Sequence, residues 1–472
     1  MIKFGTGGWR AIIGDDFTRE NIQILAAAMA AKIKAEGVQD TPVCIGYDRR
    51  FLSKETVYWV CEVLAAENIP VLFVNRSVPS PMVMYYVEKH DLAYGMMVTA
   101  SHNPSLYNGI KVFTRGGRDA DEVQTKDIER YIAQVNPAEI KRMDYAEAKA
   151  SGFVKEFYPL NEYVDNIINC INMTAIRDAG LKVVMDPMYG VGEPALGAIL
   201  HTARCDVDVI HGNHDTLFGR KLPAPTAEGL KELSVAVVDN GFDVGIAMDG
   251  DADRLGIIDE KGRYLHPNEI LCLLYYYLVK FKGWNGPAVR NLATSHRLDR
   301  IAESFGEVCY EVPVGFKHIS AKITEQDAVL GGESSGGLTV RGHIKGKDGV
   351  YAASLIVEMI AVIGKPLSEI VKDLDELYGP VSEMVELGFK FSQAKKDELY
   401  DLLFVQKKLP DLTGFEVDHT SYFDGCKVYF KNGGWIIARF SGTEPLIRVF
   451  CEMPSDEDAK EVSNRFVSFL GL

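Results

Sequence analysis

Residues 92–104 read Leu92-Ala93-Tyr94-Gly95-Met96-Met97-Val98-Thr99-Ala100-Ser101-His102-Asn103-Pro104, and they decide how the rest of the chain is interpreted. The first seven residues form an apolar run with the length and composition of a buried strand. A polar turn follows, and then the next apolar run, Ile110-Lys111-Val112-Phe113. Ser101 is therefore expected where a strand ends, the place where open α/β sheets bind ligands. For this stretch alone, a Ser-His pair in an ordinary turn explains the pattern equally well.

Composition limits the class of protein. The chain has 472 residues, enough for about three domains. It is 47% hydrophobic and 25% charged, as in globular proteins with an ample core. The net charge of -15 argues against nucleic acid and anionic membranes as partners. The longest apolar stretch, 270–279, is far short of the ~20 residues that span a bilayer. Eight cysteines without a CxxC pair, and an N-terminus unlike a signal peptide, predict reduced thiols and a cytoplasmic location.

Strands and helices alternate along most of the chain. Apolar runs of strand length at 43–46, 71–74 and 94–98 are separated by segments with helical periodicity. The same alternation starts again after residue 150 and near residue 265. This predicts three comparable α/β units with mainly parallel sheets covered on both faces. From about residue 375 the pattern changes to that of a smaller α+β domain.

An acidic loop is the sharpest chemical signal. It reads Asp249-Gly250-Asp251-Ala252-Asp253-Arg254, with apolar strand-like runs on both sides. Three carboxylates that alternate with small residues can turn toward one hard cation, Mg²⁺ or Ca²⁺. An EF-hand is excluded because Arg254 stands where that loop needs glycine. A solvated acidic turn is the simple alternative, but three charges between apolar strands would repel without a cation, so a metal site is favoured.

Two further loops contain groups suited to sugar phosphates. In Gly331-Gly332-Glu333-Ser334-Ser335-Gly336-Gly337, Glu333 and Ser335 offer acceptors and donors for sugar hydroxyls, although a flexible turn is the better explanation in isolation. The loop from Arg439 to Arg448 contains two guanidinium groups and two hydroxyls, which favours phosphate binding over an incidental surface turn. The small-residue loop from Gly5 to Arg10 is weak on its own.

Together these loops resemble, in order and over essentially the whole chain, the α-D-phosphohexomutase superfamily of the phosphoglucomutase/phosphomannomutase type. That family has a TASHNP-type serine loop, a DGDADR-type metal loop, a GExS sugar loop and an RxSGTEPxxR phosphate loop. The resemblance implies three related α/β mixed-sheet domains and a C-terminal α+β domain like the TATA-binding protein, around a central cleft. The expected domains are the phosphoserine-loop domain 1–152, the metal-loop domain 153–253, the sugar-binding domain 254–374 and the phosphate-binding domain 375–472.

The resemblance also implies roles for individual residues. Ser101 would carry the phosphoryl group and, with Asp249, Asp251 and Asp253, would hold Mg²⁺. Lys111 and His102 are both candidates for the general base, Lys111 because the pKa of a lysine falls near other cations. Arg10 completes the catalytic set, and Asp48 and Arg50 match a DxR pattern of the first domain. The implied substrate-binding residues are Arg254, Lys317, Glu333, Ser335, Arg439, Ser441, Gly442, Thr443 and Arg448.

The implied activity is Mg²⁺-dependent interconversion of glucose 1-phosphate and glucose 6-phosphate, with glucose 1,6-bisphosphate as intermediate and activator. Dual-specificity members read GEMSGH and phosphoglucosamine mutases GEQSGH, whereas here Gly337 stands in place of the histidine, as in the GEESxG of phosphoglucomutases. Phosphomannomutase or phosphopentomutase activity remains the alternative within the family. A phosphatase with a serine nucleophile would usually need more metals and histidine ligands, and a catalytically dead sugar-phosphate binder is disfavoured by the intact Ser101. The expected partners are small sugar phosphates only, with a monomer or homodimer as the assembly.

Overall fold

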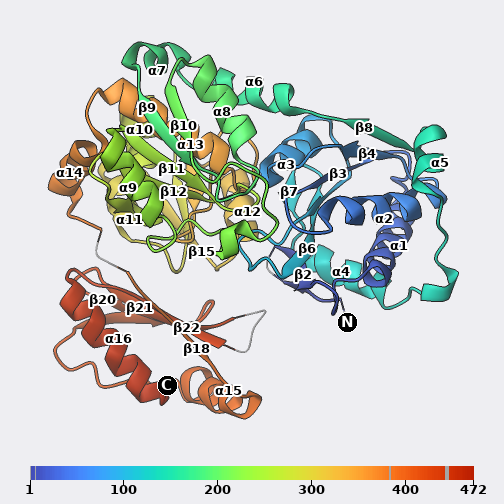
Figure 1. Ribbon diagram of the computed structural model, residues 1–472. Coiled ribbons are helices and arrows are strands. Elements are labelled where there is room, and N and C mark those ends of the chain that lie inside the picture. The colour runs from blue at the N-terminus through green and yellow to red at the C-terminus, as the bar shows by residue number, and fades with distance from the viewer. Residues whose placement is uncertain (1, 6, 382–383, 442–445) are drawn as a thin grey trace.

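The computed structural model describes residues 2–5, 7–381, 384–441 and 446–472. Over these residues the chain forms four sheets, and each sheet with its helices is one domain of a four-domain α/β architecture (Figure 1). The first three domains have mixed sheets, and the fourth has an antiparallel sheet. In Figure 1 the fourth domain, in red, lies below the second and third domains and apart from the helices α1 and α2 of the first domain.

Domain 1 places Ser101 at the end of a central strand. Its sheet has the order β1-β2-β6-β5-β3-β4-β8, and β7 pairs with β6. β5 is buried along its whole length and lies parallel to β3 and antiparallel to β6, so the Ser101 loop connects two adjacent strands. The elements are β1 (Phe4–Gly5), β2 (Gly8–Ile12), α1 (Arg19–Ala35), β3 (Val43–Tyr47), α2 (Ser53–Ala66), β4 (Val71–Val74), α3 (Ser80–Lys89), β5 (Tyr94–Val98), β6 (Tyr107–Thr114), β7 (Arg118–Asp119), α4 (Glu122–Ile132), α5 (Tyr145–Ala150) and β8 (Val154–Phe157).

Domain 2 presents the acidic loop as a hairpin. β11 and β12 are antiparallel with Met248 opposite Leu255, so residues 249–254 form the turn between two buried strands. The sheet order is β10-β9-β11-β12-β13. The elements are α6 (Leu160–Cys170), α7 (Met173–Ala179), β9 (Lys182–Asp186), α8 (Glu193–Thr202), β10 (Asp206–Val209), α9 (Lys231–Asn240), β11 (Val244–Met248), β12 (Leu255–Asp259) and β13 (Tyr264–Leu265).

Domain 3 carries the Gly-Ser loop between two short strands. Its sheet has the order β15-β14-β16-β17, and the loop with Glu333 and Ser335 joins the antiparallel strands β16 and β17. The elements are α10 (Pro267–Lys280), β14 (Ala288–Asn291), α11 (Arg297–Ser304), β15 (Cys309–Val312), α12 (Phe316–Gln326), β16 (Leu330–Gly332), β17 (Leu338–Val340), α13 (Gly349–Ile363) and α14 (Leu367–Tyr378).

Domain 4 is an antiparallel sheet with the order β18-β22-β21-β20-β19. Helix α16 packs on β22 and β18, and Arg439 of β21 is paired with Arg448 of β22. The elements are β18 (Val385–Lys390), α15 (Gln393–Tyr400), β19 (Val417–Ser421), β20 (Cys426–Phe430), β21 (Trp435–Phe440), β22 (Leu446–Glu452) and α16 (Asp456–Leu470).

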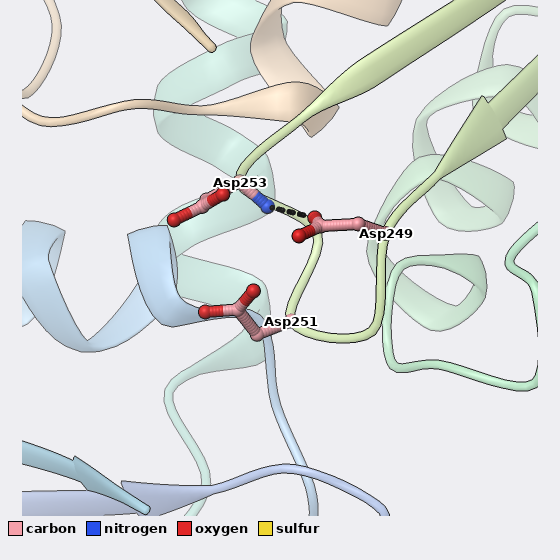
Figure 2. A group of neighbouring side chains, drawn as sticks. All are labelled: Asp249, Asp251 and Asp253. Atoms are coloured by element: carbon pink, nitrogen blue, oxygen red, sulfur yellow. Dashed lines mark hydrogen bonds between the residues drawn. The ribbon is translucent and has the colours of Figure 1, made fainter. Parts of the chain in front are cut away.

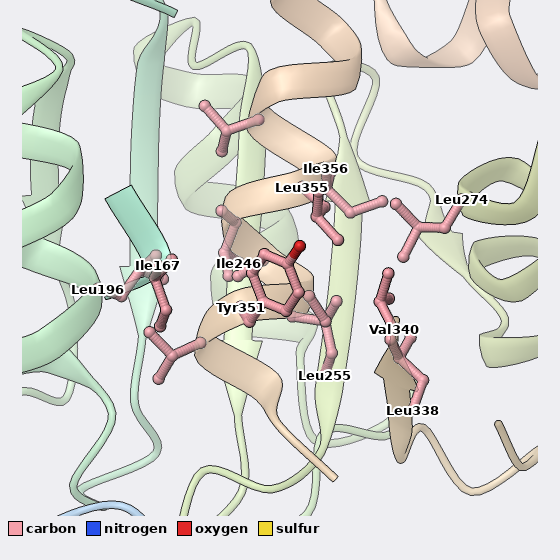
Figure 3. Packing of buried hydrophobic residues seen from close by; sticks show 14 of the residues in the cluster. Ile167, Leu196, Ile246, Leu255, Leu274, Leu338, Val340, Tyr351, Leu355 and Ile356 are labelled. Carbon is pink, nitrogen blue, oxygen red and sulfur yellow. The ribbon is translucent and has the colours of Figure 1, made fainter. Parts of the chain in front are cut away.

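Helix α13 joins the cores of domains 2 and 3. Figure 3 shows it between Ile167 and Leu196 on one side and Leu274 and Val340 on the other. The helix begins at the N-cap Asp348 and is buried from Gly349 to Ile360. Because its apolar side chains face both neighbours, the two domains share one continuous hydrophobic core.

Sheet membership extends past two of the expected boundaries. β8 completes the first sheet beyond residue 152, and β12 and β13 complete the second sheet beyond residue 253. The sequence around these residues does not mark a boundary, because a strand that joins an earlier sheet has the same apolar pattern as one that starts a new sheet. The domain boundaries therefore stay predictions.

Among the described residues, no single helix is long and apolar enough to cross a membrane. The pair α13 and α14 meets that length and composition only when both are joined across a bend of 83°.

Candidate active site

The serine loop is held by two buried side chains from the turn after β3. Thr99 Oγ1 donates to Asp48 Oδ2 at 2.6 Å and accepts from the backbone N of Ser101 at 2.8 Å. Arg50 Nη2 donates to the carbonyl oxygens of Ser101 and Asn103 at 2.6 and 2.7 Å. Ser101 itself has a φ of 53°, in the left-handed region that costs a non-glycine residue about 1–2 kcal/mol. This bonding holds the strained backbone in place, as is common at functional loops.

The three aspartates of the hairpin lie together (Figure 2). One oxygen of each lies within 4.8 Å of the others, and all three side chains are buried. Asp249 Oδ1 accepts from the backbone N of Asp253 and Arg254 at 3.0 and 3.1 Å, which fixes the turn. Ser101 Oγ donates to Asp249 Oδ2 at 2.8 Å. The site thus combines the serine of domain 1 with the carboxylates of domain 2.

Two of these carboxylate oxygens show that the site fits a divalent cation. Asp251 Oδ1 and Asp253 Oδ1 are buried, and neither has a hydrogen-bond partner among the described residues. Unpaired buried carboxylate oxygens are costly, and an all-oxygen donor set is the one that Mg²⁺ and Ca²⁺ prefer. Burial, and then the charges of Asp253 and Asp251, raise the pKa of Asp249 to about 8. A bound cation would offset that crowding of negative charge.

Lys111 comes from β6 and bridges two of the aspartates. Its Nζ donates to Asp251 Oδ2 at 2.6 Å and to Asp253 Oδ2 at 2.7 Å. Although burial opposes the charge of Lys111, Asp251 and Asp253 raise its pKa above the ordinary value. The expectation that neighbouring cations would lower this pKa is wrong, because the effect of Asp251 and Asp253 outweighs that of the nearby Arg10. Lys111 is therefore an ammonium that neutralises charge.

His102 follows the nucleophile in the chain and contacts it. Its Nδ1 is 3.3 Å from Ser101 Oγ. Burial, and then the cations Arg254 and Arg10, lower the pKa of His102 far below its ordinary value. The imidazole is therefore neutral at physiological pH, and the same burial and positive charge make it a weaker base than an ordinary histidine.

Arg10 and Arg254 add positive charge beside the serine. Arg10 Nη1 donates to Asn103 Oδ1 at 2.6 Å. Burial, and then the nearby Arg254, lower the pKa of Arg10. Arg254 Nε is buried without a hydrogen-bond partner within the described part of the chain. Two guanidinium groups this close repel each other, and an anion such as a phosphate group would relieve that repulsion.

Two residues of the site were missed by the sequence reasoning. Lys347 Nζ is 3.1 Å from Asp253 Oδ2. The methylene groups of Lys347 pack against Gly337 so closely that a Cβ on that glycine would lie 2.2 Å from Lys347 Cδ. Ser80, at the start of α3, donates to Asp251 Oδ2 at 2.5 Å. The glycines on either side of Lys347-Asp348 are a turn signal that marks the lysine as a loop residue. Nothing in the local sequence singles out Ser80.

The sugar-loop residues, 331–337, lie next to the turn 249–254 between β11 and β12, which we call the metal hairpin. Glu333 Oε1 accepts from Asn291 Nδ2 at 3.0 Å and from the backbone N of Gly315 at 3.3 Å. Ser335 Oγ is 3.5 Å from Glu333 Oε2. The backbone N of Leu255, just after the acidic loop, donates to the carbonyl oxygen of Gly336 at 3.0 Å. Lys317, at the start of α12, makes a long ion pair of 3.7 Å with Glu122 of domain 1.

The phosphate-loop residues stand on domain 4. Arg439 and Arg448 face each other on β21 and β22, and they pair with Asp424 at 2.9 Å and Glu386 at 3.4 Å. Within the described residues, no ion pair joins either arginine to the aspartates of the metal hairpin. The backbone N of Ser441 donates to the carbonyl oxygen of Leu446 at 2.8 Å. Gly442 and Thr443 lie outside the described residues.

Comparisons with known proteins agree with this arrangement. Phosphoglucomutase/phosphomannomutase alpha/beta/alpha domains I, II and III match residues 1–139, 161–262 and 266–378, and the C-terminal domain of the same proteins matches 393–468. A phosphoglucomutase/phosphomannomutase of Thermococcus kodakarensis is 29% identical over 97% of this chain and 96% of its own. A protein of Methanopyrus kandleri named "Probable phosphoglucosamine mutase" is 30% identical over 99% of this chain and 97% of its own.

A solved structure has the same fold over the whole chain. A phosphoglucomutase/phosphomannomutase family protein of Burkholderia thailandensis superposes with a TM-score of 0.84, 23% identity and coverage of 100% of this chain and 98% of its own. The fold and the site together define a phosphohexomutase, an isomerase that moves a phosphoryl group on a sugar. The chain belongs to the phosphoglucomutase/phosphomannomutase family of the α-D-phosphohexomutase superfamily.

Proposed function

We propose that this enzyme interconverts glucose 1-phosphate and glucose 6-phosphate through a phosphorylated Ser101 and a glucose 1,6-bisphosphate intermediate. The observation that carries the glucose preference is the packing of Lys347 over Gly337. Dual-specificity enzymes of the resembled family carry a histidine at this place in the sugar loop. Here Gly337 stands at that place and the Lys347 stem packs against it, which supports a sugar loop closer to that of phosphoglucomutases.

The proposed reaction begins at phosphorylated Ser101. The bond from Ser101 Oγ to phosphorus breaks as the free hydroxyl oxygen of the sugar monophosphate bonds to the same phosphorus. The hydroxyl proton passes to a base, for which His102 is the candidate in contact with the nucleophile, with its Nδ1 3.3 Å from Ser101 Oγ, whereas Asp251 and Asp253 favour the ammonium form of Lys111. The bisphosphate then turns around, and its other phosphoryl group returns to Ser101.

The charged groups of the site support the transfer. Arg10, Arg254 and Lys111 surround the oxygens of the moving phosphoryl group with positive charge in a buried setting, where such charges act strongly. We propose Mg²⁺ as the ion held by Ser101, Asp249, Asp251 and Asp253; when bound, it neutralises charge on the transferring oxygens. Glu333 and Ser335 would bind sugar hydroxyls, while Lys317 and the loop from Arg439 to Arg448 would bind the phosphate that does not react.

Glucosamine phosphate is the second candidate substrate. It is favoured by the relative from Methanopyrus kandleri, which is named for that activity and covers nearly the whole chain. Mannose and pentose phosphates are further alternatives within the same family.

A side-by-side kinetic comparison tests the proposal. Purified enzyme with Mg²⁺ and the matching bisphosphate would be assayed with the 1-phosphates of glucose, mannose, glucosamine and ribose. The expected result is the highest kcat/KM for glucose 1-phosphate. A higher kcat/KM for any of the others would reassign the substrate, and release of inorganic phosphate without isomerisation would indicate a serine phosphatase instead.

A further inference from the structure

A buried polar cluster is built around the residue that follows Lys347 in the chain. At its centre is Asp348, the N-cap of α13, whose Oδ1 accepts from the backbone N of Val350 and Tyr351 at 2.9 and 3.0 Å. Its Oδ2 accepts from Tyr163 Oη at 2.7 Å and lies 2.6 Å from His343 Nε2. An N-cap needs only one side-chain oxygen to bind the first helical N–H groups. The second oxygen, Oδ2, is therefore free to bind side chains outside the helix.

The two partners of that second oxygen come from different domains. Tyr163 is on α6 of domain 2 and is fully buried, while His343 is in the loop between β17 and α13. His343 Nδ1 is 3.0 Å from Asn166 Nδ2, one turn further along α6. If the amide of Asn166 donates to Nδ1, the other ring nitrogen, Nε2, carries the proton and donates to Asp348. The cluster thus ties the loop that contains Lys347 to α6.

The backbone next to Lys347 is fixed as well. The backbone N of Asp348 donates to the carbonyl oxygen of Leu338 in β17 at 3.1 Å, and that of Gly349 donates to Ala252 in the metal hairpin at 3.1 Å. A Cβ at Gly349 would lie 2.8 Å from the Ala252 oxygen, so only glycine allows this approach. Lys347 is consequently attached at the point where the sugar loop meets the metal hairpin.

We propose that Tyr163 and His343 are positioning residues that act through Asp348 to hold the Lys347 side chain between the sugar loop and Asp253. Lysine has a flexible four-carbon stem, and a charge that is fixed before the reaction contributes more than one that must first be ordered. This inference rests on the proposed phosphoryl transfer at Ser101 but does not depend on which sugar is the substrate.

The test is a double-mutant cycle on kcat. Tyr163→Phe removes one hydroxyl, and we expect it to lower kcat about three- to tenfold while KM for the sugar monophosphate changes less than twofold. In a Lys347→Met background the same substitution should lower kcat by less than 1.5-fold, because the side chain that it positions is gone. Equal effects in the two backgrounds would overturn the proposal, since a general structural defect acts with or without Lys347.

Two further comparisons separate positioning from folding. His343→Gln keeps an N–H that can reach Asp348 and should retain more than half of kcat, whereas His343→Leu should lose kcat as Tyr163→Phe does. Tyr85→Phe is the matched control, because Tyr85 stacks on the ring of His343 with centroids 6.3 Å apart and should leave kcat unchanged.

A readout other than activity completes the design. Amide hydrogen exchange of the segment 343–351 should become faster in Tyr163→Phe, while exchange in domain 4 stays the same. Unchanged exchange in that segment would contradict the proposed tie to α6. All kinetic measurements use the sugar monophosphate that the wild-type enzyme converts best. A wild type that prefers mannose phosphate would thus refute the glucose assignment, and the cycle would still decide the positioning role.

Discussion

At the scale of single residues, Asp253 is the carboxylate that side chains from several domains contact. Lys111 from domain 1 and Lys347 from domain 3 both contact its Oδ2, at 2.7 and 3.1 Å. Although burial disfavours the charge of this carboxylate, Lys111, Lys347 and Arg254 hold its pKa well below the ordinary value. Cations from domains 1 and 3 therefore keep this aspartate of domain 2 ionised. Ion pairs with one carboxylate thus join the first three domains at the candidate site.

Lys111→Met should lower kcat about a hundredfold or more and change KM by only a few-fold, because its charge lies beside the transferring group rather than at the distant phosphate. Steady-state kinetics with glucose 1-phosphate measure both constants. Lys126→Met, at an exposed lysine of α4, is the matched control and should behave like wild type. A large rise in KM with kcat preserved would contradict the assignment.

Asp251→Asn should weaken Mg²⁺ binding at least tenfold, since the substitution removes one full charge from an all-oxygen site. Isothermal calorimetry with MgCl₂ on the purified protein measures this directly. Asp91→Asn serves as control, because Asp91 is an exposed carboxylate that pairs with Arg115 at the surface. The same Mg²⁺ affinity in Asp251→Asn and wild type would refute the metal site.

At the scale of elements, α13 and the hairpin β11–β12 position the site. α13 is mostly apolar because it lies between two domains (Figure 3). Its first residue, Gly349, donates its backbone N–H to the carbonyl oxygen of Ala252 in the metal hairpin. Stability and site geometry therefore depend on the same helix.

Leu355→Ala should destabilise the protein by about 2–5 kcal/mol, because Leu355 is fully buried in the shared core and truncation leaves a cavity. Urea denaturation followed by circular dichroism gives the change in the free energy of unfolding. Val362→Ala on the same helix is the control, since Val362 is 37% exposed and should cost well under half as much. Equal destabilisation by both substitutions would mean that the helix does not join the two cores as described.

Sequence patterns predict these elements well and their tertiary contacts poorly. The apolar runs on either side of 249–254 correctly indicated a strand before and a strand after the acidic loop, because burial on both faces leaves a local signature. The contact of Lys347 with Asp253 joins residues 94 positions apart (347 − 253), so no local pattern reports it. The pKa of Lys111 was expected to fall for the same reason: the sequence shows nearby cations but not which charges the fold brings closest.

At the scale of the whole molecule, domain 4 is fixed to domain 3 by buried polar contacts. Lys427 Nζ donates to the carbonyl oxygen of Leu292 at 2.8 Å and to Glu311 Oε2 at 2.7 Å. Glu452 accepts from Ser295 Oγ at 2.5 Å and from the backbone N of His296 at 3.1 Å. The two phosphate-loop arginines are thus positioned relative to the sugar loop, on a different domain from Ser101.

Arg448→Ala should raise KM roughly ten- to hundredfold for both the 1-phosphate and the 6-phosphate, with little change in kcat, because a group remote from the breaking bond binds ground and transition states alike. It should also require more added glucose 1,6-bisphosphate for full rate, since the loop must rebind the turned intermediate. Arg465→Ala, at an arginine of α16 in the same domain, is the control. An unchanged KM and bisphosphate requirement would remove Arg448 from the phosphate site.

The most direct test of the central claim is the intact mass of the enzyme after incubation with glucose 1,6-bisphosphate. One phosphoryl group, about 80 Da, should be added to the wild type and should disappear when sugar monophosphate is supplied in excess. The folded Ser101→Ala variant should gain no mass and show no turnover. A wild type that isomerises the sugar phosphate without ever gaining this mass, or an equal gain in Ser101→Ala, would contradict the account.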